Sequence, residues 1–318
     1  MIARPSFSII VPTFRRPAQL SACLAALAAL RYPRERYEVI VVDDGSGAPP
    51  ANEVARAAAS LPVRLHRAEH GGPGSARNAG ASVAEGDFLA FTDDDCAPEP
   101  DWLGALAGHL ARTPDAAIGG RTINALPDNV YSTASQLLVS YLYDYYAAPR
   151  RRPRRFFTTN NLALRRDAFD ALGGFDVHTP CGTAEDRDLC ARWSHSGRAL
   201  AYAPDAVVHH AHHLDALSFL RQHYRYGRSA LYVERARALR ANDRVRLEPL
   251  SFYWGMLAYP FQDGNGARSV VLSLLIALTQ AAYAHGVARQ LLGDLFGAPR
   301  KRVNRAGRLL DFNGQEDT

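Results

Sequence analysis

Hydrophobic and polar positions alternate between two patterns along the first part of the chain. Short apolar runs such as Ser8–Val11, Val39–Val42 and Phe88–Thr92 predict buried strands, because they are too brief for helices. Between the strands lie segments such as Pro17–Leu30 and Pro100–Arg112, whose apolar positions recur every three or four residues and predict amphipathic helices. Regular strand–helix alternation predicts an α/β fold with a Rossmann-like, doubly wound, mostly parallel sheet.

The later elements are predicted in the same way. Further strands are expected at Val63–His66, Ile118–Asn124, Thr158–Leu164 and Ala206–Val208, and further helices near Asn52–Ser60, Ser75–Ala84, Tyr131–Tyr146 and Glu185–Ser196. In the last third, Asp215 is expected to cap a long basic helix, and an uncharged segment covers Ser269–Ala288. We therefore expect two parts, an α/β domain over residues 1–214 and a helical carboxyl-terminal region over residues 215–318.

Composition narrows the class of protein but does not identify a function. The 318 residues are 47% hydrophobic and 22% charged, which excludes a wholly disordered or fibrous chain. The net charge of +5 comes almost entirely from arginine, and a basic excess suits phosphorylated or anionic partners without choosing among them. The four cysteines form no CxxC pair, and the amino terminus resembles no signal peptide. Both features predict a cytoplasmic protein with free thiols.

Two predicted strands end in acidic residues. Asp93-Asp94-Asp95 follows one strand and Asp43-Asp44 ends another. The carboxyl ends of parallel strands meet at one edge of a sheet, and carboxylate oxygens suit Mg²⁺ or Mn²⁺. A solvated turn is the alternative for Asp93-Asp94-Asp95 alone. A second acidic strand end argues against it, since like charges gathered in one crevice are costly without a cation or donor partners.

A glycine-rich segment, Gly71–Asn78, precedes a predicted helix. Glycines allow a close backbone approach and a helix amino terminus favours phosphate, so a phosphate site and a plain tight turn both remain open. The segment is neither a Walker P-loop nor a GxGxxG fingerprint after the first strand. This argues against P-loop NTPases and against dinucleotide-dependent dehydrogenases.

Five motifs occur in a characteristic order. They are Val11-Pro12-Thr13-Phe14, Val41-Val42-Asp43-Asp44-Gly45-Ser46, Gly72 through Gly80, Phe91-Thr92-Asp93-Asp94-Asp95, and Glu185-Asp186-Arg187-Asp188-Leu189. With these motifs the chain resembles family 2 glycosyltransferases over roughly residues 6 to 230. The resemblance implies the GT-A fold and an inverting, hexosyltransferase-like enzyme. Such an enzyme moves a sugar from a nucleotide-diphosphate sugar to the hydroxyl of a glycan, polysaccharide or lipid-linked acceptor.

The resemblance also implies roles for individual residues. Nucleotide contacts fall on Pro12, Thr13, Asp44, Arg77, Asp93 and Asp94, and a metal site for Mg²⁺ or Mn²⁺ falls on Asp95, Asp93 and His210. His209 and His212 stay open as alternatives to His210. Asp186 is expected to be the general base, with Glu185 as its neighbour and substitute. Arg225, Arg228 and Asn161 are expected near the diphosphate or the acceptor, with a basic solvated helix face as the alternative for the arginines.

Other functions are weighed against this one. A sugar-phosphate nucleotidyltransferase relies on an early glycine-rich loop with a lysine, whereas here the loop after the first strand is not glycine-rich and the only lysine is Lys301. A non-catalytic nucleotide-binding scaffold of the same fold is a further alternative, although intact Asp95 and Asp186 argue against it. Nucleic acid is not an expected partner, because the arginine clusters lack interleaved aromatic residues.

The uncharged segment Ser269–Ala288 bears on localisation. The segment is long enough to cross a bilayer, which takes roughly 20 apolar residues, but Gln280, His285 and Gly286 weaken this interpretation, and a buried or interfacial helix is equally expected. A basic cluster follows at Arg300, Lys301, Arg302, Arg305 and Arg308, and such clusters bind anionic headgroups. We therefore expect membrane association at the inner face of the cell membrane.

Overall fold

The computed structural model describes residues 5–245, 247–262, 264, 266–296, 302–303 and 309–310. Its contacts divide the chain into two compact units. The first unit comprises Met1–Leu126, Pro153–Val177 and Glu185–His212, and the second comprises Pro127–Arg152, His178–Ala184 and His213–Thr318. The last boundary between the two units lies between His212 and His213, two residues before the predicted boundary after residue 214. Two earlier segments of the second unit fall inside the predicted α/β domain.

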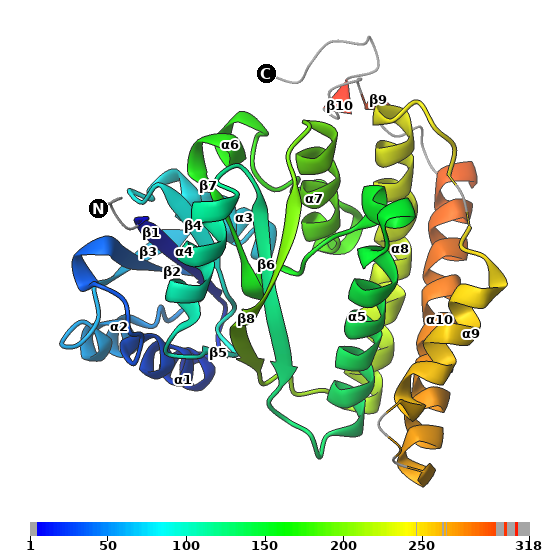
Figure 1. The fold of residues 1–318 in the computed structure, drawn as a ribbon, viewed down its shortest axis with the longest axis horizontal. Helices are drawn as coiled ribbons and strands as arrows, with labels where there is room; N and C mark the ends of the chain where they lie inside the picture. Colours follow the sequence, from blue (N-terminus) through cyan, green and yellow to red (C-terminus); the bar gives the residue numbers. More distant parts are fainter. Residues whose placement is uncertain are drawn as a thin grey trace. The chain divides into compact units, whose positions relative to one another are not determined.

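In the described part of the chain, the first unit contains one eight-stranded sheet (Figure 1). Its strands are β1 Phe7–Thr13, β2 Tyr37–Asp44, β3 Val63–Ala68, β4 Phe88–Phe91, β5 Cys96–Pro98, β6 Ala117–Asn124, β7 Leu162–Arg165 and β8 Leu200–His210. They lie in the order β3-β2-β1-β4-β7-β6-β8-β5. Only β7 and β5 run antiparallel to their neighbours. The predicted α/β class and mostly parallel sheet are confirmed.

Helices cover both faces of the sheet in this unit (Figure 1). They are α1 Pro17–Ala28, α2 Ala51–Ala57, α3 Pro73–Ser82, α4 Trp102–Arg112, α6 Arg166–Ala171 and α7 Glu185–His195, with 3-10 turns at Arg34–Arg36 and Thr159–Asn161. The predicted apolar face of α4 is fully buried in one core with alternate residues of β1 and β2. Strand alternation therefore gives each side of the sheet its own apolar layer.

Two local differences from the predicted elements matter for the site. The expected strand Thr158–Leu164 begins as a 3-10 turn, and β7 starts only at Leu162. The reason is that the side chains of Asn160 and Asn161 hydrogen-bond within the turn and to neighbouring strands, which competes with ladder pairing. The strand β5 was not predicted, because three residues ending in proline have no periodic pattern.

The second unit is mainly helical. Its helices are α5 Val130–Ala147, α8 Ala216–Arg240, α9 Leu250–Ala258 and α10 Gly266–Phe296, with 3-10 turns at Pro180–Gly182 and Tyr259–Phe261. A further 3-10 turn spans Pro149–Arg154, and short strands lie at Arg302–Val303 and Leu309–Leu310. Asp215 caps α8 as expected, and its carboxylate accepts from the Ser218 backbone N–H at 2.7 Å. The predicted helical carboxyl-terminal region is confirmed.

Candidate functional site

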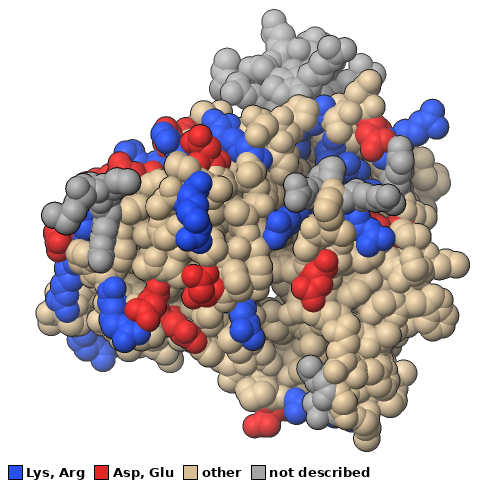
Figure 2. All heavy atoms as spheres, viewed as in Figure 1, with Lys and Arg blue, Asp and Glu red and all other residues tan. Residues whose placement is uncertain are grey.

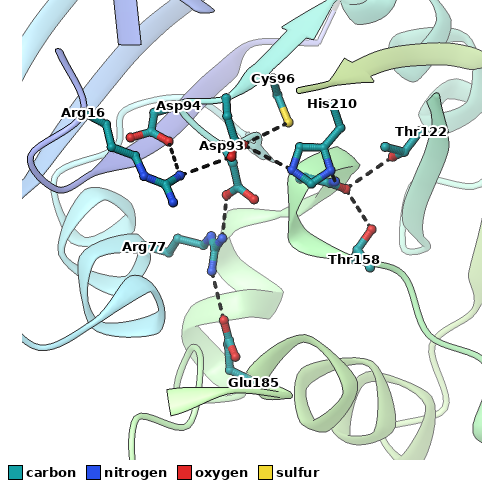
Figure 3. A network of polar contacts seen from close by, with 11 residues as sticks. Arg16, Arg77, Asp93, Asp94, Cys96, Thr122, Thr158, Glu185 and His210 are labelled. Atoms are coloured by element: carbon teal, nitrogen blue, oxygen red, sulfur yellow. Dashed lines mark hydrogen bonds and ion pairs between the residues drawn. The ribbon is translucent and has the colours of Figure 1, made fainter. Parts of the chain in front are cut away.

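The site is built on the acidic residues that follow β4. Because β1 and β4 are parallel neighbours, their carboxyl ends meet, and the Thr13 hydroxyl donates to Asp94 Oδ2 at 2.7 Å. Arg16, in the turn after β1, places Nη1 3.2 Å from Asp94 Oδ1 and 3.1 Å from Asp95 Oδ2 (Figure 3). The structure therefore brings Thr13, Asp94 and Asp95 together as predicted, and it adds Arg16. Pro12 lies within β1 beside Val42 of β2.

Arg77 links this cluster to the start of α7. It lies on α3, which begins directly after Gly72. The backbone of Gly72 has a φ of +86°, which glycine adopts more readily than other residues. The guanidinium is only 4% exposed, and it donates to Asp93 Oδ1 at 2.6 Å and to Glu185 Oε1 at 3.1 Å (Figure 3). Burial opposes its charge, but Asp93 and Glu185 outweigh burial and raise the pKa of Arg77. A permanent cation thus sits between two acidic segments far apart in sequence.

Glu185 and Asp186 form an adjacent carboxyl pair at the amino end of α7. Burial raises the pKa of Glu185 to about 7, with the Arg77 charge opposing this rise and the Asp186 charge adding to it. Burial also raises the pKa of Asp186, whose Oδ1 accepts from the Arg187 backbone N–H at 2.7 Å. Carboxyl groups with raised proton affinity are suited to accept a proton near neutral pH.

Asp95 meets His210 through the unpredicted strand β5. Pairing of β5 with β8 sets Cys96 opposite His210, and Asp95 Oδ1 lies 3.2 Å from His210 Nε2. Although burial opposes ionisation, the hydrogen bond and charge of His210 and the charge of Arg16 lower the pKa of Asp95 to about 2. Of the histidines left open by the sequence, His209 instead lies 3.0 Å from Glu99 Oε1. Side chains alternate along a strand, so the two neighbours face opposite sides.

This pair belongs to the one cluster of metal-binding side chains found in the described residues. Donor atoms of Asp95, Cys96 and His210 all lie within 4.8 Å of one another. Burial, reinforced by the charges of Asp93 and Asp95, raises the pKa of the Cys96 thiol well above its usual value, so it stays protonated. Asp95 and His210 are therefore the candidate ligands. The carboxylate of Asp93, which is also a predicted ligand, forms an ion pair with Arg77.

The glycine-rich turn is held by Asp44 at the end of β2. Its two carboxylate oxygens accept from the backbone N–H groups of Gly71 and Gly72 at 2.9 and 3.1 Å. His70 Nδ1 lies 3.0 Å from Asp44 Oδ2, and the His70 ring stacks on Phe14. In this structure these N–H groups already have an acceptor, so the tight turn describes the segment better than a phosphate cradle.

Asn161, predicted near the diphosphate or the acceptor, has several contacts within the fold. It is 1% exposed, its Oδ1 accepts from the Trp102 indole N–H at 2.9 Å, and its Nδ2 donates to the carbonyls of Arg121 and Ala206. With both ends of the amide used inside the fold, Asn161 secures the turn before β7. The expected role of Asn161 at the diphosphate or the acceptor stays a prediction.

The two predicted arginines of α8 belong to the second unit. Arg225 Nη2 donates to the Cys181 carbonyl at 2.6 Å, and the buried Nε of Arg228 has no hydrogen-bond partner. Their contact with a diphosphate or an acceptor stays a prediction. Sequence reasoning missed Arg16, Thr122 and Thr158 altogether. Arg16 alone had a signal, since it directly follows the first strand at the edge where ligands bind.

Comparisons with known proteins agree with this arrangement. A model of the family described as glycosyl transferase family 2 matches residues 8–173. The pre-mycofactocin glycosyltransferase of Mycobacterium tuberculosis is 30% identical over 227 residues, which are 70% of this chain and 46% of that protein. The succinoglycan biosynthesis protein ExoM of Rhizobium meliloti is 30% identical over 250 residues, 74% of this chain and 78% of that protein. The chain thus spans about half the length of the first of these relatives.

Solved structures share the fold. A mannosyltransferase from Pyrobaculum calidifontis, in complex with GDP-Man and Mn²⁺, aligns with a TM-score of 0.57 at 21% identity and covers 93% of this chain and 82% of that one. Residues 1–349 of TarS from Staphylococcus aureus, in complex with UDP-GlcNAc, align with a TM-score of 0.55 at 18% identity and cover 98% of both chains. The predicted GT-A fold is confirmed. Given a family match over more than half of its residues, the chain belongs to glycosyl transferase family 2.

Proposed function

We propose that the chain is an inverting glycosyltransferase that moves a sugar from a nucleotide-diphosphate sugar to an acceptor hydroxyl. One observation carries the proposal: the Glu185–Asp186 carboxyl pair is joined through buried Arg77 to the acidic end of β4. A carboxyl pair of raised proton affinity next to a fixed positive charge supports a base that acts in this site. A non-catalytic scaffold would not need a carboxyl pair of raised proton affinity beside that charge.

The reaction then needs a single displacement. Asp186 takes the proton of the acceptor hydroxyl, and the acceptor oxygen forms a bond to the anomeric carbon of the donor sugar. The bond from that carbon to the diphosphate oxygen breaks, and the leaving diphosphate takes the electron pair. Because the attack comes from the face opposite the leaving group, the configuration inverts and no covalent sugar–enzyme intermediate forms. Glu185, held by Arg77, supports the base.

A divalent cation fits the pair Asp95 and His210. The carboxylate is ionised at any ordinary pH, the imidazole Nε2 lies 3.2 Å away, and oxygen and nitrogen donors together suit Mn²⁺, with Mg²⁺ as the alternative. When bound, the cation supplies positive charge to the diphosphate. The similar mannosyltransferase, whose structure is in complex with GDP-Man and Mn²⁺, supports the use of a divalent cation.

The donor and acceptor classes are supported by the relatives. The similar structures hold GDP-Man or UDP-GlcNAc, and both ligands are nucleotide-diphosphate sugars. ExoM is named for succinoglycan biosynthesis, and a Haloferax volcanii relative, 26% identical over 220 residues, is named a glucosyl-dolichyl phosphate glucuronosyltransferase. A glycan or a lipid-linked acceptor is consistent with these names.

The second unit supports a position at the inner face of the cell membrane. Among the described residues, α10 is long and apolar enough to cross a bilayer by length and composition, and only 22% of its most apolar stretch is buried. Exposed apolar residues also occur on α9, and Figure 2 shows few charged side chains over the part of the surface formed by α9 and α10. The exposed apolar residues of α9 and α10 include Leu250, Trp254, Val270, Leu274 and Leu278.

Of the predicted headgroup-binding cluster, Arg300, Lys301, Arg305 and Arg308 lie outside the described residues. Arg302 lies in β9.

Calorimetric titration of the full chain with UDP, GDP, dTDP and ADP, with and without Mn²⁺, tests the proposed function. We expect one nucleotide to bind, to need Mn²⁺, and to lose affinity in Asp95→Ala. With the matching sugar donor, Asp186→Asn is expected to bind as the wild type does but to turn over about 10²–10⁴-fold more slowly. Asp167→Asn, an exposed carboxylate paired with Arg165, is the control. Binding of no nucleotide under any metal condition would refute the proposal.

A further inference from the structure

A chain of polar contacts leads away from His210 on the side opposite Asp95. His210 Nδ1 lies 3.3 Å from the side-chain Nδ2 of Asn160. Asn160 Oδ1 in turn accepts from the hydroxyls of Thr158 at 2.8 Å and Thr122 at 3.3 Å (Figure 3). Asn160 is 7% exposed, so its amide has protein partners on both sides.

The contacts determine where the imidazole proton lies. With the amide N–H₂ group directed at Nδ1, that nitrogen must be the acceptor, and the ring proton lies on Nε2, directed at Asp95. A nitrogen that carries a proton has no lone pair for a cation. The arrangement therefore describes His210 bound to Asp95 and not His210 as a metal ligand.

Rotation of the Asn160 amide by a half turn exchanges the donor and the acceptor in each of these hydrogen bonds. Oδ1 then accepts a proton from Nδ1, and Nδ2 donates to the two threonine oxygens, because a hydroxyl both donates and accepts. The ring proton moves to Nδ1, which leaves the Nε2 lone pair available for a cation. Histidines that bind metals ordinarily donate their second ring N–H to an oxygen in this way.

We propose that Asn160 is a positioning residue that selects the tautomer of His210, and that Thr122 and Thr158 allow its amide to adopt both orientations. The inference rests on the proposed function, because it takes Asp95 and His210 as the cation site. The neighbouring residue Asn161 has a different role. Its amide contacts the Trp102 indole and the carbonyls of Arg121 and Ala206, which fixes the turn and involves no titratable group.

Two substitutions at Asn160 separate tautomer selection from a purely structural role. Asn160→Leu keeps the size of the side chain and removes the acceptor, so Mn²⁺ affinity is expected to fall about 10–100-fold. Asn160→Asp supplies an oxygen acceptor permanently and is expected to keep Mn²⁺ affinity within about threefold of the wild type or to raise it. A residue that only held the turn would not give opposite results for these two variants.

The measurement is titration of the full chain with Mn²⁺ alone, following the free ion by electron paramagnetic resonance. His210→Ala is the positive control for loss of the site, and His209→Ala, next to it on β8, is the control expected to bind as the wild type does. Equal Mn²⁺ affinity in Asn160→Leu and wild type, with loss in His210→Ala, overturns this inference and leaves the metal site standing. Unchanged affinity in His210→Ala overturns the metal site and the inference together. If Asn160→Leu does not fold, weakened binding by a folded Asn160→Asp also overturns the inference.

Discussion

The carboxyl groups of the site differ widely in how readily they ionise. Burial acts on all of them, yet His210 and Arg16 lower the pKa of Asp95 to about 2, while the pKa of Asp94 is raised to about 6. Burial raises the pKa of Glu185 to about 7, even though Arg77 donates to it. The contrast separates a carboxylate that stays ionised from carboxyl groups that exchange protons near neutrality.

The raised pKa of Glu185 predicts how stability depends on pH. Between its ordinary value of 4.5 and about 7, the folded chain keeps a proton that the unfolded chain releases. The contribution of this group to the free energy of unfolding is therefore greatest below pH 4.5 and is lost as pH rises through 7. Glu185→Gln removes the ionisation, so the variant should gain on the order of 1–3 kcal/mol relative to wild type between pH 5 and pH 8. Urea unfolding at the two pH values measures this.

Glu53→Gln provides the matched control, because half-buried Glu53 also pairs with an arginine, the exposed Arg56 on the same helix α2. It should leave the wild-type pH dependence unchanged. If Glu185→Gln shows the same pH dependence as wild type, the buried carboxyl pair does not hold the proton as described.

At the scale of elements, the contact between α8 and α10 depends on two glycines. A Cβ atom at Gly227 would lie 2.0 Å from the Tyr283 carbonyl oxygen, and one at Gly286 would lie 2.1 Å from the Tyr224 carbonyl oxygen. Both obstacles are backbone atoms, which cannot rotate away. In the sequence, Gly286 argued against a membrane-spanning helix. In the structure, its missing side chain lets α8 and α10 approach closely.

Gly286→Ala should therefore destabilise the folded protein. A methyl group forced against backbone typically costs about 1–3 kcal/mol, which exceeds the gain in helix propensity of about 1 kcal/mol. Gly293→Ala on the same helix meets nothing within 4 Å and should be neutral or slightly stabilising. Urea denaturation of both full-length variants measures the difference. Equal midpoints for the two variants would show that α8 and α10 do not pack through Gly286.

At the scale of the whole molecule, the two units differ in what they expose. The first unit buries its apolar residues around the sheet, whereas the second exposes Leu250 and Trp254 on α9 and several apolar residues of α10. Exposed tryptophan and leucine on helices suit the boundary between water and lipid. In our proposal, the chemistry of transfer and the attachment to a membrane belong to different units.

The full chain should bind vesicles that contain anionic phosphatidylglycerol without detergent, and it should bind neutral phosphatidylcholine vesicles more weakly. Flotation on a density gradient measures the bound fraction. Trp254→Ser should reduce that fraction several-fold, because Trp254 is 70% exposed and apolar contact is lost. Val177→Ser, a 45% exposed apolar residue of the first unit, serves as the control. A wild-type chain that stays unbound with both vesicle types would contradict the membrane proposal.

Sequence patterns alone determined the class of fold and named many residues of the candidate site. Apolar periodicity marks β1, β2 and α4, because burial on one or two faces leaves a regular trace over many residues. The acidic ends of β2 and β4 could be assigned to one edge, since parallel strands share a direction. The order of the five motifs supplied the family, and with it Asp95, Glu185 and Asp186.

Tertiary structure decided which of these residues act on one another. The pairing of β5 with β8 selects His210 over His209, and buried Arg77 connects Asp93 with Glu185 across 108 positions of sequence. Asn160 and Asn161 look alike in sequence, yet one amide faces an imidazole and the other an indole and two carbonyls. Such contacts are made by short strands and single turns that lie far apart in the sequence and meet only in the folded chain. They leave no periodic pattern, so only the folded chain defines them.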